Sequence, residues 1–236
     1  GNVGQISFVQ ANLRYRASVD KAVQGADHVV NCVGILFESG RNGFDAVQDF
    51  GARAVAEAAR SVGATLTHIS AIGADAKSDS VYATTKGRAE AAIQSILPDA
   101  TILRPSIVFG PEDGFFNKFA AMAQLSPVLP LVGGGKTKFQ PVYVEDVAEV
   151  VARAVDGSIA RGKIYELGGR DVMTFKQCLE TMLEVVGRKR ALIPLPFGIA
   201  SLIGSVASAI PLITPPLTPD QVTLLRKDNV VSAAAK

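Results

Sequence analysis

Apolar positions in the first half of the chain fall into short continuous runs separated by longer segments with a helical period. The short runs predict strands at 6–11, 27–34, 65–70 and 101–103. The longer segments predict two helices, one from Val47 to a stop at Gly63 and one from Tyr82 to Leu97. Strands that alternate with helices in this way are typical of βαβ units, so we expect an α/β fold with a doubly wound parallel sheet.

The pattern is less regular from about residue 111 onward. Here we predict a strand at 140–144, a helix whose inner face spans 147–154, a helix opened by a capping box at Thr174 and Gln177, and irregular chain around Pro127, Pro130 and 133–135. The chain therefore divides into a parallel-sheet domain at 1–110 and a smaller, mixed C-terminal region at 111–236. Residues 140–156 are expected to return to the first domain.

The segment between Arg190 and Asp220 contains no charged residue. Its longest proline-free part, 197–210, would reach about 21 Å as a helix, which is short of the ~30 Å hydrocarbon core of a bilayer. Small residues recur along this part and permit close helix approach. We therefore predict a helix that packs on protein or on another subunit. Contact with a membrane surface, helped by the basic run 188–190, is the alternative.

Composition excludes several classes of function. The 236 residues include 24 Lys and Arg against 22 Asp and Glu, a net charge of +2, which gives no electrostatic reason to expect nucleic acid as a partner. Cys32 and Cys178 lie in apolar runs without paired spacing, and there are only two histidines. We therefore predict neither a disulfide nor a metal site. A reducing compartment, the cytoplasm, fits this cysteine usage.

Tyr82 and Lys86 are the leading candidates for chemistry. Their i, i+4 spacing places the phenol and the ammonium on one face of the predicted helix. A nearby ammonium favours the phenolate, so we expect the pKa of Tyr82 to be lowered from its usual ~10, as general acid or base catalysis requires. The same lysine can hydrogen-bond a ribose. Taken alone, the spacing also fits a solvated pair on a helix surface.

The position of this pair favours a ligand site. In a doubly wound sheet, ligands bind beyond the carboxyl ends of the strands. Four segments follow predicted strands at that edge: Asn12 and Leu13; Cys32, Val33 and Gly34; Ser70 and Ala71; and Pro105, Ser106, Ile107 and Val108. We expect these segments to surround one ligand together with the tyrosine and the lysine.

The order of these motifs resembles a known family. A strand followed by N-L precedes V-N-x-V-G, H-I-S-A-I-G-A, Y-x-x-x-K, L-R-P-S-I-V-F-G and P-V-Y-V-E-D-V-A. Over nearly the whole chain this resembles the extended and atypical short-chain dehydrogenases/reductases, a group of NAD-dependent epimerase/dehydratases. Within the group, 68–74, 104–116 and 134–147 are most similar to the nucleotide-binding accessory subunit of respiratory complex I and its bacterial relatives.

The resemblance implies a Rossmann domain that binds NAD or NADP, and it implies residue roles. Tyr82 matches the catalytic tyrosine, and Lys86 matches the lysine that holds the nicotinamide ribose. The implied cofactor contacts are Asn12 and Leu13 at the adenine, Val33 and Gly34 beside the adenosine with Cys32 before them, and Pro105, Ser106, Ile107 and Val108 against the nicotinamide.

Two departures from the family pattern bear on activity. Active members commonly carry a serine or threonine one step after the strand, where Ala71 occurs here, so Ser70 is the candidate to hydrogen-bond the substrate. The family's first strand and its G-x-x-G-x-x-G loop, whose amides hold the pyrophosphate, do not occur in this sequence. We therefore expect a chain without the first βαβ unit, which also carries the residue that distinguishes NAD from NADP.

Two functions of different class follow. The first is an NAD(P)-dependent oxidoreductase or epimerase, favoured by the intact tyrosine and lysine. The second is a non-catalytic, dinucleotide-holding subunit of a respiratory NADH dehydrogenase complex, peripheral at the inner membrane, favoured by Ala71 and the uncharged segment 192–219. The oligomeric state stays open.

The presumed substrate side is rich in apolar residues, namely Phe115, Phe116, Phe119, Leu192, Ile193 and Leu195. They favour a hydrophobic or quinone-like small molecule over a nucleotide-sugar, which would need polar side chains. A hydrophobic seam between two domains predicts the same composition, so both interpretations stay open here.

Overall fold

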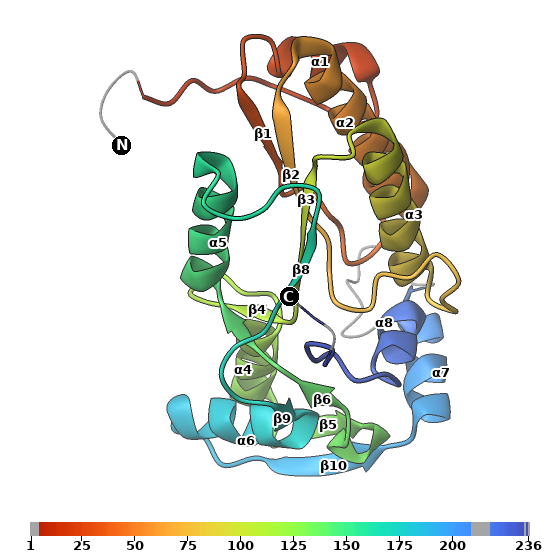
Figure 1. Ribbon diagram of the computed structural model, residues 1–236. Coiled ribbons are helices and arrows are strands. Elements are labelled where there is room, and N and C mark those ends of the chain that lie inside the picture. Colours follow the sequence, from red (N-terminus) through yellow and green to blue (C-terminus); the bar gives the residue numbers. More distant parts are fainter. Residues whose placement is uncertain (1–4, 209–217, 234, 236) are drawn as a thin grey trace.

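The computed structural model describes residues 5–208, 218–233 and 235, in which a four-stranded parallel sheet forms the larger part (Figure 1). Its strands, in spatial order, are β1 (His28–Asn31), β2 (Thr65–Ile69), β3 (Thr101–Pro105) and β8 (Ile164–Leu167). Each neighbouring pair is parallel. The α/β fold with a parallel sheet, predicted from the alternation of apolar runs, is confirmed.

Helices cover both faces of this sheet, as doubly wound folds require. Figure 1 shows α5 on one side and α1, α2 and α3 on the other. Their bounds are α1 (Arg16–Ala22), α2 (Gly51–Val62), α3 (Val81–Ile96) and α5 (Val144–Asp156), with the π-helical turn η1 (Asp45–Phe50) leading into α2. We call these helices and the four strands the sheet lobe.

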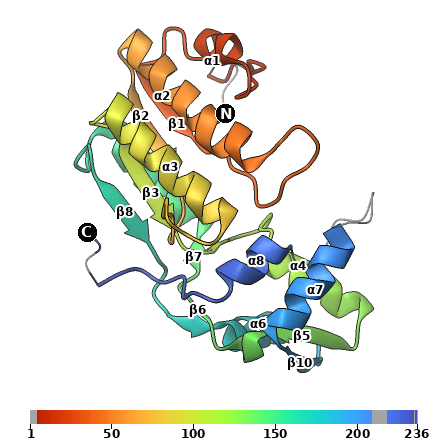
Figure 2. The same ribbon diagram turned by 90° about the vertical axis from the view of Figure 1, so that its right-hand side faces the viewer.

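The apolar face of α2 explains how this side of the lobe packs. Its buried alanines lie in one core with Leu66 of β2 and with Ala89 and Ile93 of α3. Small side chains on both helices allow α2 and α3 to approach the sheet and each other closely, which is visible in Figure 2. Gly63 ends α2 in the left-handed conformation, at φ 74°, as the sequence predicts.

A second, smaller lobe follows β3 along the chain. Its elements are β4 (Val108–Phe109), α4 (Phe116–Leu125), β5 (Val128–Val132), η2 (Gly133–Gly135), β6 (Lys138–Phe139), β7 (Val142–Tyr143), β9 (Met173–Thr174), α6 (Phe175–Val185), β10 (Ala191–Leu195), α7 (Phe197–Ser208) and α8 (Pro219–Leu224). Phe119, Phe139 and Phe175 lie together in its core, so we call it the aromatic lobe. The domain boundary at residue 110 stays a prediction.

The predicted strand at 6–11 is wrong. These residues form no strand, and Ile6 and Phe8 are exposed, the latter by 98%. A strand needs a hydrogen-bonded neighbour, and β1 is the edge strand with β2 as its only partner in the described chain. No described strand lies beside this apolar run, so its backbone has no partner with which to form a sheet.

Two features of the second half differ from the prediction of irregular chain. β5 and β10 form a parallel pair although Pro130 and Pro194 lie within them. Each strand has one free edge, so a residue without an N–H is tolerated. β8 joins the main sheet after α5, so the return to the sheet continues beyond the predicted 140–156.

Helix α7 covers the predicted helix at 197–210 as far as Ser208, and the last two residues lie outside the described part. Ala200 is buried in the aromatic core, whereas Ile199, Leu202 and Ile203 are exposed. Among the helices of the described residues, none has both the length and the apolarity needed to cross a bilayer.

Candidate functional site

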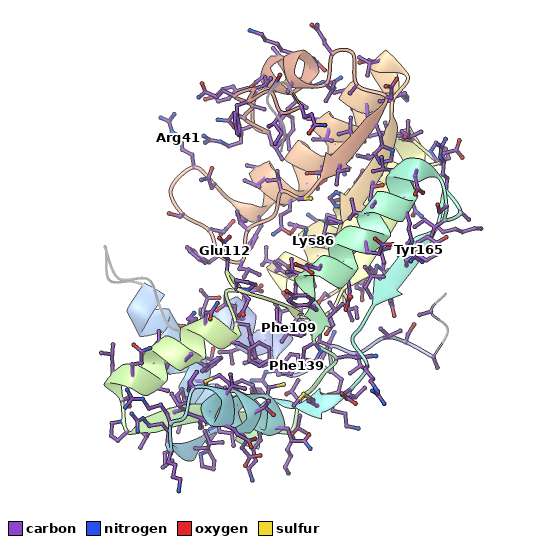
Figure 3. The ribbon with its side chains drawn as sticks, turned by 90° about the vertical axis from the view of Figure 1, so that its left-hand side faces the viewer. Arg41, Lys86, Phe109, Glu112, Phe139 and Tyr165 are labelled. Atoms are coloured by element: carbon purple, nitrogen blue, oxygen red, sulfur yellow. The ribbon has the colours of Figure 1, made fainter. Side chains whose placement is uncertain are left out.

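A cavity of about 490 Å³ lies where the carboxyl ends of β1, β2 and β3 meet the aromatic lobe. The segments that follow these three strands line it, together with the first turns of α3 and residues 221–229. Figure 3 shows Lys86 at this end of the sheet, with Phe139 on the facing lobe. The sequence placed a ligand site at this edge because parallel strands end there together.

Lys86 reaches the cavity from the second turn of α3. Its Nζ donates a hydrogen bond to the backbone oxygen of Ile69, the last residue of β2, at 3.1 Å. Burial lowers the pKa of Lys86 to about 8, and the nearby Glu90 carboxylate opposes that shift. Gly34 lies beside the ammonium, since a Cβ there would be 3.2 Å from Nζ. The glycine therefore leaves room for a ligand next to the amine.

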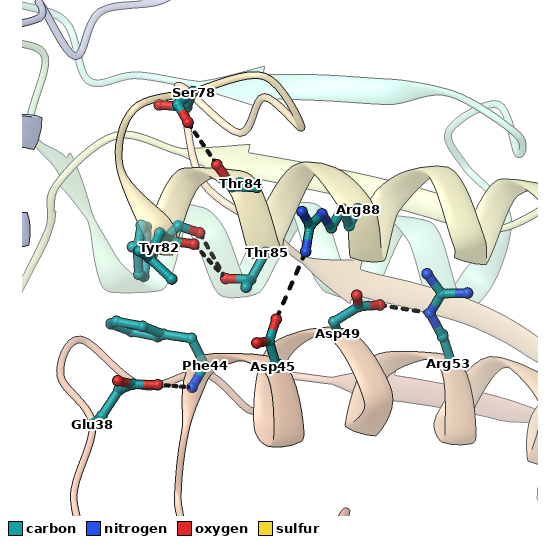
Figure 4. Close-up of polar contacts among 11 residues, drawn as sticks. Glu38, Phe44, Asp45, Asp49, Arg53, Ser78, Tyr82, Thr84, Thr85 and Arg88 are labelled. Carbon is teal, nitrogen blue, oxygen red and sulfur yellow. Dashed lines mark hydrogen bonds and ion pairs between the residues drawn. The ribbon is translucent and has the colours of Figure 1, made fainter.

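Tyr82 lies one helical turn before the lysine, with its ring edge-on to Phe44 at a centroid distance of 6.0 Å (Figure 4). Burial, and then the negative charge of Asp220, raise the pKa of Tyr82 to about 12. The prediction that the ammonium lowers this pKa is wrong for the chain as described. Burial removes water from the phenolate and so raises the pKa, and this effect is larger than any lowering of the pKa by the Lys86 ammonium. The phenol is therefore protonated at neutral pH.

Ser70 is buried at the end of β2, and its hydroxyl has no hydrogen-bond partner among the described residues. A buried hydroxyl without a partner is costly, so a ligand or an ordered water is expected to complete it. Behind it on β2, His68 is held by the Asn31 amide at 3.1 Å, and burial lowers the pKa of His68 to about 3. That histidine is neutral and belongs to the sheet core.

The C-terminal segment forms one wall of the cavity, which the sequence did not predict. Asn229 contacts the segments after β2 and β3: its Nδ2 donates to Ile72 O at 3.2 Å, and its Oδ1 lies 2.6 Å from the Ser106 hydroxyl. Asp220 contacts the start of α3. The capping pattern at Thr218 and Gln221, confirmed in the structure, was the one signal that could have located this segment.

Apolar side chains form the wall that faces the sheet lobe. Those lining the cavity include Ile107, Phe115, Phe119, Phe139, Phe175, Leu224 and Leu225. Phe115 packs against Phe119 and Phe139 at centroid distances of 5.4 and 5.8 Å. The cavity therefore offers polar groups on the sheet side and an aromatic surface on the other. Phe116 instead lines a separate groove, and Ile193 is half-exposed.

The structure brings together most, but not all, of the residues predicted for the site. Those lining the cavity are Cys32, Gly34, Ser70, Tyr82, Lys86, Pro105, Ser106, Ile107 and Val108. Val33 does not line it and is 45% exposed. Asn12 accepts hydrogen bonds from Arg14 at the start of α1, and Leu13 packs against Gly51 of α2. The adenine role of Asn12 and Leu13 stays a prediction.

These groups fit the sugar of a dinucleotide. The Lys86 ammonium has three N–H groups and uses one on Ile69, so two can donate to hydroxyls. Gly34 keeps that approach open, and the Ser70 hydroxyl is available beside it. A protonated phenol one turn away can donate a proton to an oxygen held in the cavity.

Comparison with known proteins gives the family. A model described as "NAD dependent epimerase/dehydratase family" matches residues 1–168. The chain belongs to this family. The resemblance read from the motifs is therefore confirmed, and the parallel sheet agrees with structures of family members.

Two similar proteins have curated names. The chain is 34% identical to the mitochondrial NADH dehydrogenase (ubiquinone) 1 alpha subcomplex subunit 9 of Arabidopsis thaliana, over 98% of this chain and 60% of that protein. It is 31% identical to the ceramide reductase of Caulobacter vibrioides, over 81% of this chain and 60% of that protein. The chain thus spans about 60% of the length of these curated relatives.

A solved structure supports the fold assignment alone. The dTDP-glucose 4,6-dehydratase of Streptomyces venezuelae, solved with NAD bound, superposes with a TM-score of 0.71 at 19% identity. The match covers 82% of this chain and 68% of the other.

Proposed function

We propose that the cavity binds the nicotinamide half of NAD or NADP and that the protein is an oxidoreductase or epimerase with Tyr82 as its proton-transfer group. One observation carries the proposal: Tyr82, Lys86 and the unpartnered hydroxyl of Ser70 line one cavity at the carboxyl ends of the strands. The family's description as NAD dependent supports the same cofactor class.

Each residue has a distinct task in this scheme. Lys86 donates to the ribose hydroxyls and holds the sugar against the end of β2. Ser70 donates a hydrogen bond to the substrate oxygen, and the Tyr82 phenol gives that oxygen a proton when a carbonyl is reduced. A reduced nicotinamide bound beside them would supply the hydride for the carbonyl carbon. The raised pKa of Tyr82 keeps the phenol protonated at neutral pH, so in the free protein this group is a proton donor and not a base.

The apolar wall favours a substrate with a large hydrophobic body. The aromatic rings of Phe115, Phe119 and Phe139 present a surface that a chain or a fused ring can cover. The ceramide reductase among the relatives is consistent with a lipid carbonyl compound as the substrate class. We propose a long-chain or polycyclic ketone, or the matching alcohol.

The experiment uses the full-length protein, reduced nicotinamide and a panel of long-chain and sterol ketones, with nicotinamide absorbance as the signal. Tyr82→Phe should lower the reduction rate by about 10²–10⁴-fold, the typical contribution of a general acid, and leave dinucleotide affinity nearly unchanged. Tyr165→Phe is the matched control, because that hydroxyl lies outside the cavity and donates to Ala160 O. Undiminished reduction by Tyr82→Phe contradicts the assignment.

A second function, a dinucleotide-holding subunit of a respiratory complex, is favoured by a specific observation. The similarity to complex I subunit 9 covers 98% of this chain, and Ala71 occurs where active members carry a hydroxyl. In this case the same cavity holds the dinucleotide without turnover, and the protein is peripheral at the inner membrane. Co-purification of the tagged full-length protein with NADH dehydrogenase subunits, with no reduction of any ketone, would favour this function over the first.

A further inference from the structure

A carboxylate from the far end of the chain contacts the helix that carries Tyr82. Asp220 Oδ1 accepts a hydrogen bond from the Val81 amide at 2.8 Å, and Oδ2 accepts one from the Tyr82 amide at 3.2 Å. The Ser80 hydroxyl also donates to Oδ2, at 2.9 Å. Three donors at the start of α3 thus converge on one side chain that lies 138 to 140 positions later in the sequence.

These contacts satisfy amides that a helix cannot satisfy itself. The first four N–H groups of a helix have no partner within it. Ser80 is the N-cap of α3 and accepts from the Ala83 amide. Asp220 accepts from the Val81 and Tyr82 amides, which Ser80 does not bind. Helix α3 is therefore capped by its own serine and by a residue of the aromatic lobe. A negative charge at this end is also favourable to the helix dipole.

The segment that carries Asp220 is anchored in the aromatic lobe. Thr218 and Gln221 form a capping box around it, and Val222 and Leu225 are buried in the aromatic core. Gln221 also donates to Leu36 O, in the segment after β1. Figure 2 shows α8 beside the end of α3 that begins at the cavity. The Asp220 carboxylate therefore links the aromatic lobe to the first turn of α3 in the sheet lobe.

We propose that Asp220 is a positioning residue for Tyr82. By capping the first turn of α3 from the aromatic lobe, it holds the phenol at the cavity. The inference rests on the proposed role of Tyr82. Asp220 itself would contact neither cofactor nor substrate and would act only through α3.

Two other carboxylates near Tyr82, those of Glu38 and Asp45, already have partners of their own. Lys86 is on the same helix and favours the phenolate. Glu38 and Asp45 approach from the segment that carries Phe44, but Glu38 is bonded to the Phe44 amide and Asp45 is exposed and paired with Arg88 (Figure 4). Among the described acidic residues, only Asp220 is bonded to the backbone of Tyr82 itself. Its negative charge raises the pKa of the phenol, in addition to the effect of burial.

The first test separates charge from packing. Asp220→Asn keeps the size of the side chain and one oxygen acceptor but removes the charge. A pH-jump absorbance titration, read before unfolding begins, reports tyrosine ionisation without any substrate, and the signal lost in Tyr82→Phe identifies Tyr82. We expect the Tyr82 midpoint to fall by roughly one pH unit in Asp220→Asn. Asp113→Asn, which removes the charge from the side chain that accepts from the first amides of α4, should leave the midpoint unchanged.

The second test reads the backbone amides instead of the phenol. Amides at the start of a helix exchange quickly unless another group accepts from them. Hydrogen exchange of the full-length protein should show protected Val81 and Tyr82 amides, and Asp220→Ala should remove that protection while Asp113→Ala should not. An unmoved midpoint in Asp220→Asn, or unprotected amides in the wild type, overturns the positioning role. Neither readout depends on turnover, so a failed ketone assay would count against the proposed function alone.

Discussion

An ion pair between α3 and the sheet allows a prediction about the stability of the fold. Arg104 of β3 donates two hydrogen bonds to Glu90 of α3, from Nε at 2.9 Å and from a terminal nitrogen at 2.5 Å. A second carboxylate, Glu166 of β8, lies 3.6 Å from the guanidinium. One arginine therefore links the helix of Tyr82 and Lys86 to two strands, and we choose Arg104→Met as the perturbation.

The magnitude follows from the burial of the partners. The Glu90 side chain is only 4% exposed, whereas that of Arg104 is 22% exposed. Removing one member of a buried pair leaves the other charge uncompensated, which typically costs 3–5 kcal/mol. Because the guanidinium is partly solvated, we expect about 3 kcal/mol at neutral pH. Adding Glu90→Gln removes the stranded charge, so the double variant should recover roughly 1 kcal/mol or more.

Urea unfolding of the full-length protein, followed by circular dichroism, measures these differences. Arg153→Met is the matched control, since Arg153 and Glu149 form an exposed i, i+4 pair on α5 and such pairs contribute about 0.5 kcal/mol or less. A loss below 1 kcal/mol in Arg104→Met, or a double variant less stable than the single one, would refute the reasoning.

Two further predictions concern α3. The buried Lys86 has a pKa of about 8 in the folded chain against 10.5 when exposed, so the unfolded state binds more protons between these values. The contribution of Lys86 to the free energy of unfolding should therefore rise from about pH 8 to pH 10.5, by roughly 3 kcal/mol at most. In urea titrations at each pH, the stability of the wild type relative to Lys86→Met should increase over this range. A Cβ at Gly87 would lie 2.3 Å from the Ala76 amide nitrogen, so Gly87→Ala should lower stability by about 1–3 kcal/mol. Gly198→Ala on α7, where a Cβ meets nothing within 4 Å, should be neutral or stabilising; equal losses in thermal unfolding would contradict this account.

Local pattern was enough to predict β1, β2, β3, α2 and α3 of the sheet lobe, whereas α1 and β8 were not predicted. The helix from Val47 to Gly63 and the strand at 65–70 depend on periodicity and on a glycine stop, both visible within a short window. The pair of β5 and β10 was missed because its two strands are about 60 residues apart and each contains a proline, which normally argues against a strand. Their stability comes from each other and from the aromatic core.

The candidate site also contains some residues that could be predicted from the sequence and others that could not. Tyr82 and Lys86 could be found because their spacing lies within one helical turn and follows a predicted strand. Asp220 and Asn229 could not, because nothing in their neighbourhood shows that they contact the start of α3 or the segments after β2 and β3. The pKa of Tyr82 was predicted in the wrong direction for the same reason, since both its burial and the Asp220 charge come from tertiary contacts.

The cavity allows one scaffold to serve both proposed functions. In both proposals Lys86 and Gly34 would serve to bind the dinucleotide. Ser70, Tyr82 and the apolar wall would matter only if a substrate enters. Loss of Tyr82 should therefore separate turnover from cofactor binding, whereas loss of Lys86 should affect both.

The central claim is that the cavity around Lys86 holds a nicotinamide dinucleotide. The most direct test is mass spectrometry of the small molecules released when the full-length protein, purified without added cofactor, is denatured. We predict NAD or NADP at up to one molecule per chain, with occupancy reduced about tenfold or more in Lys86→Ala, as expected when a buried charged hydrogen bond to the ribose is lost. Release of no dinucleotide from the wild type even after incubation with NAD and NADP, or equal occupancy in Lys86→Ala, would contradict the claim.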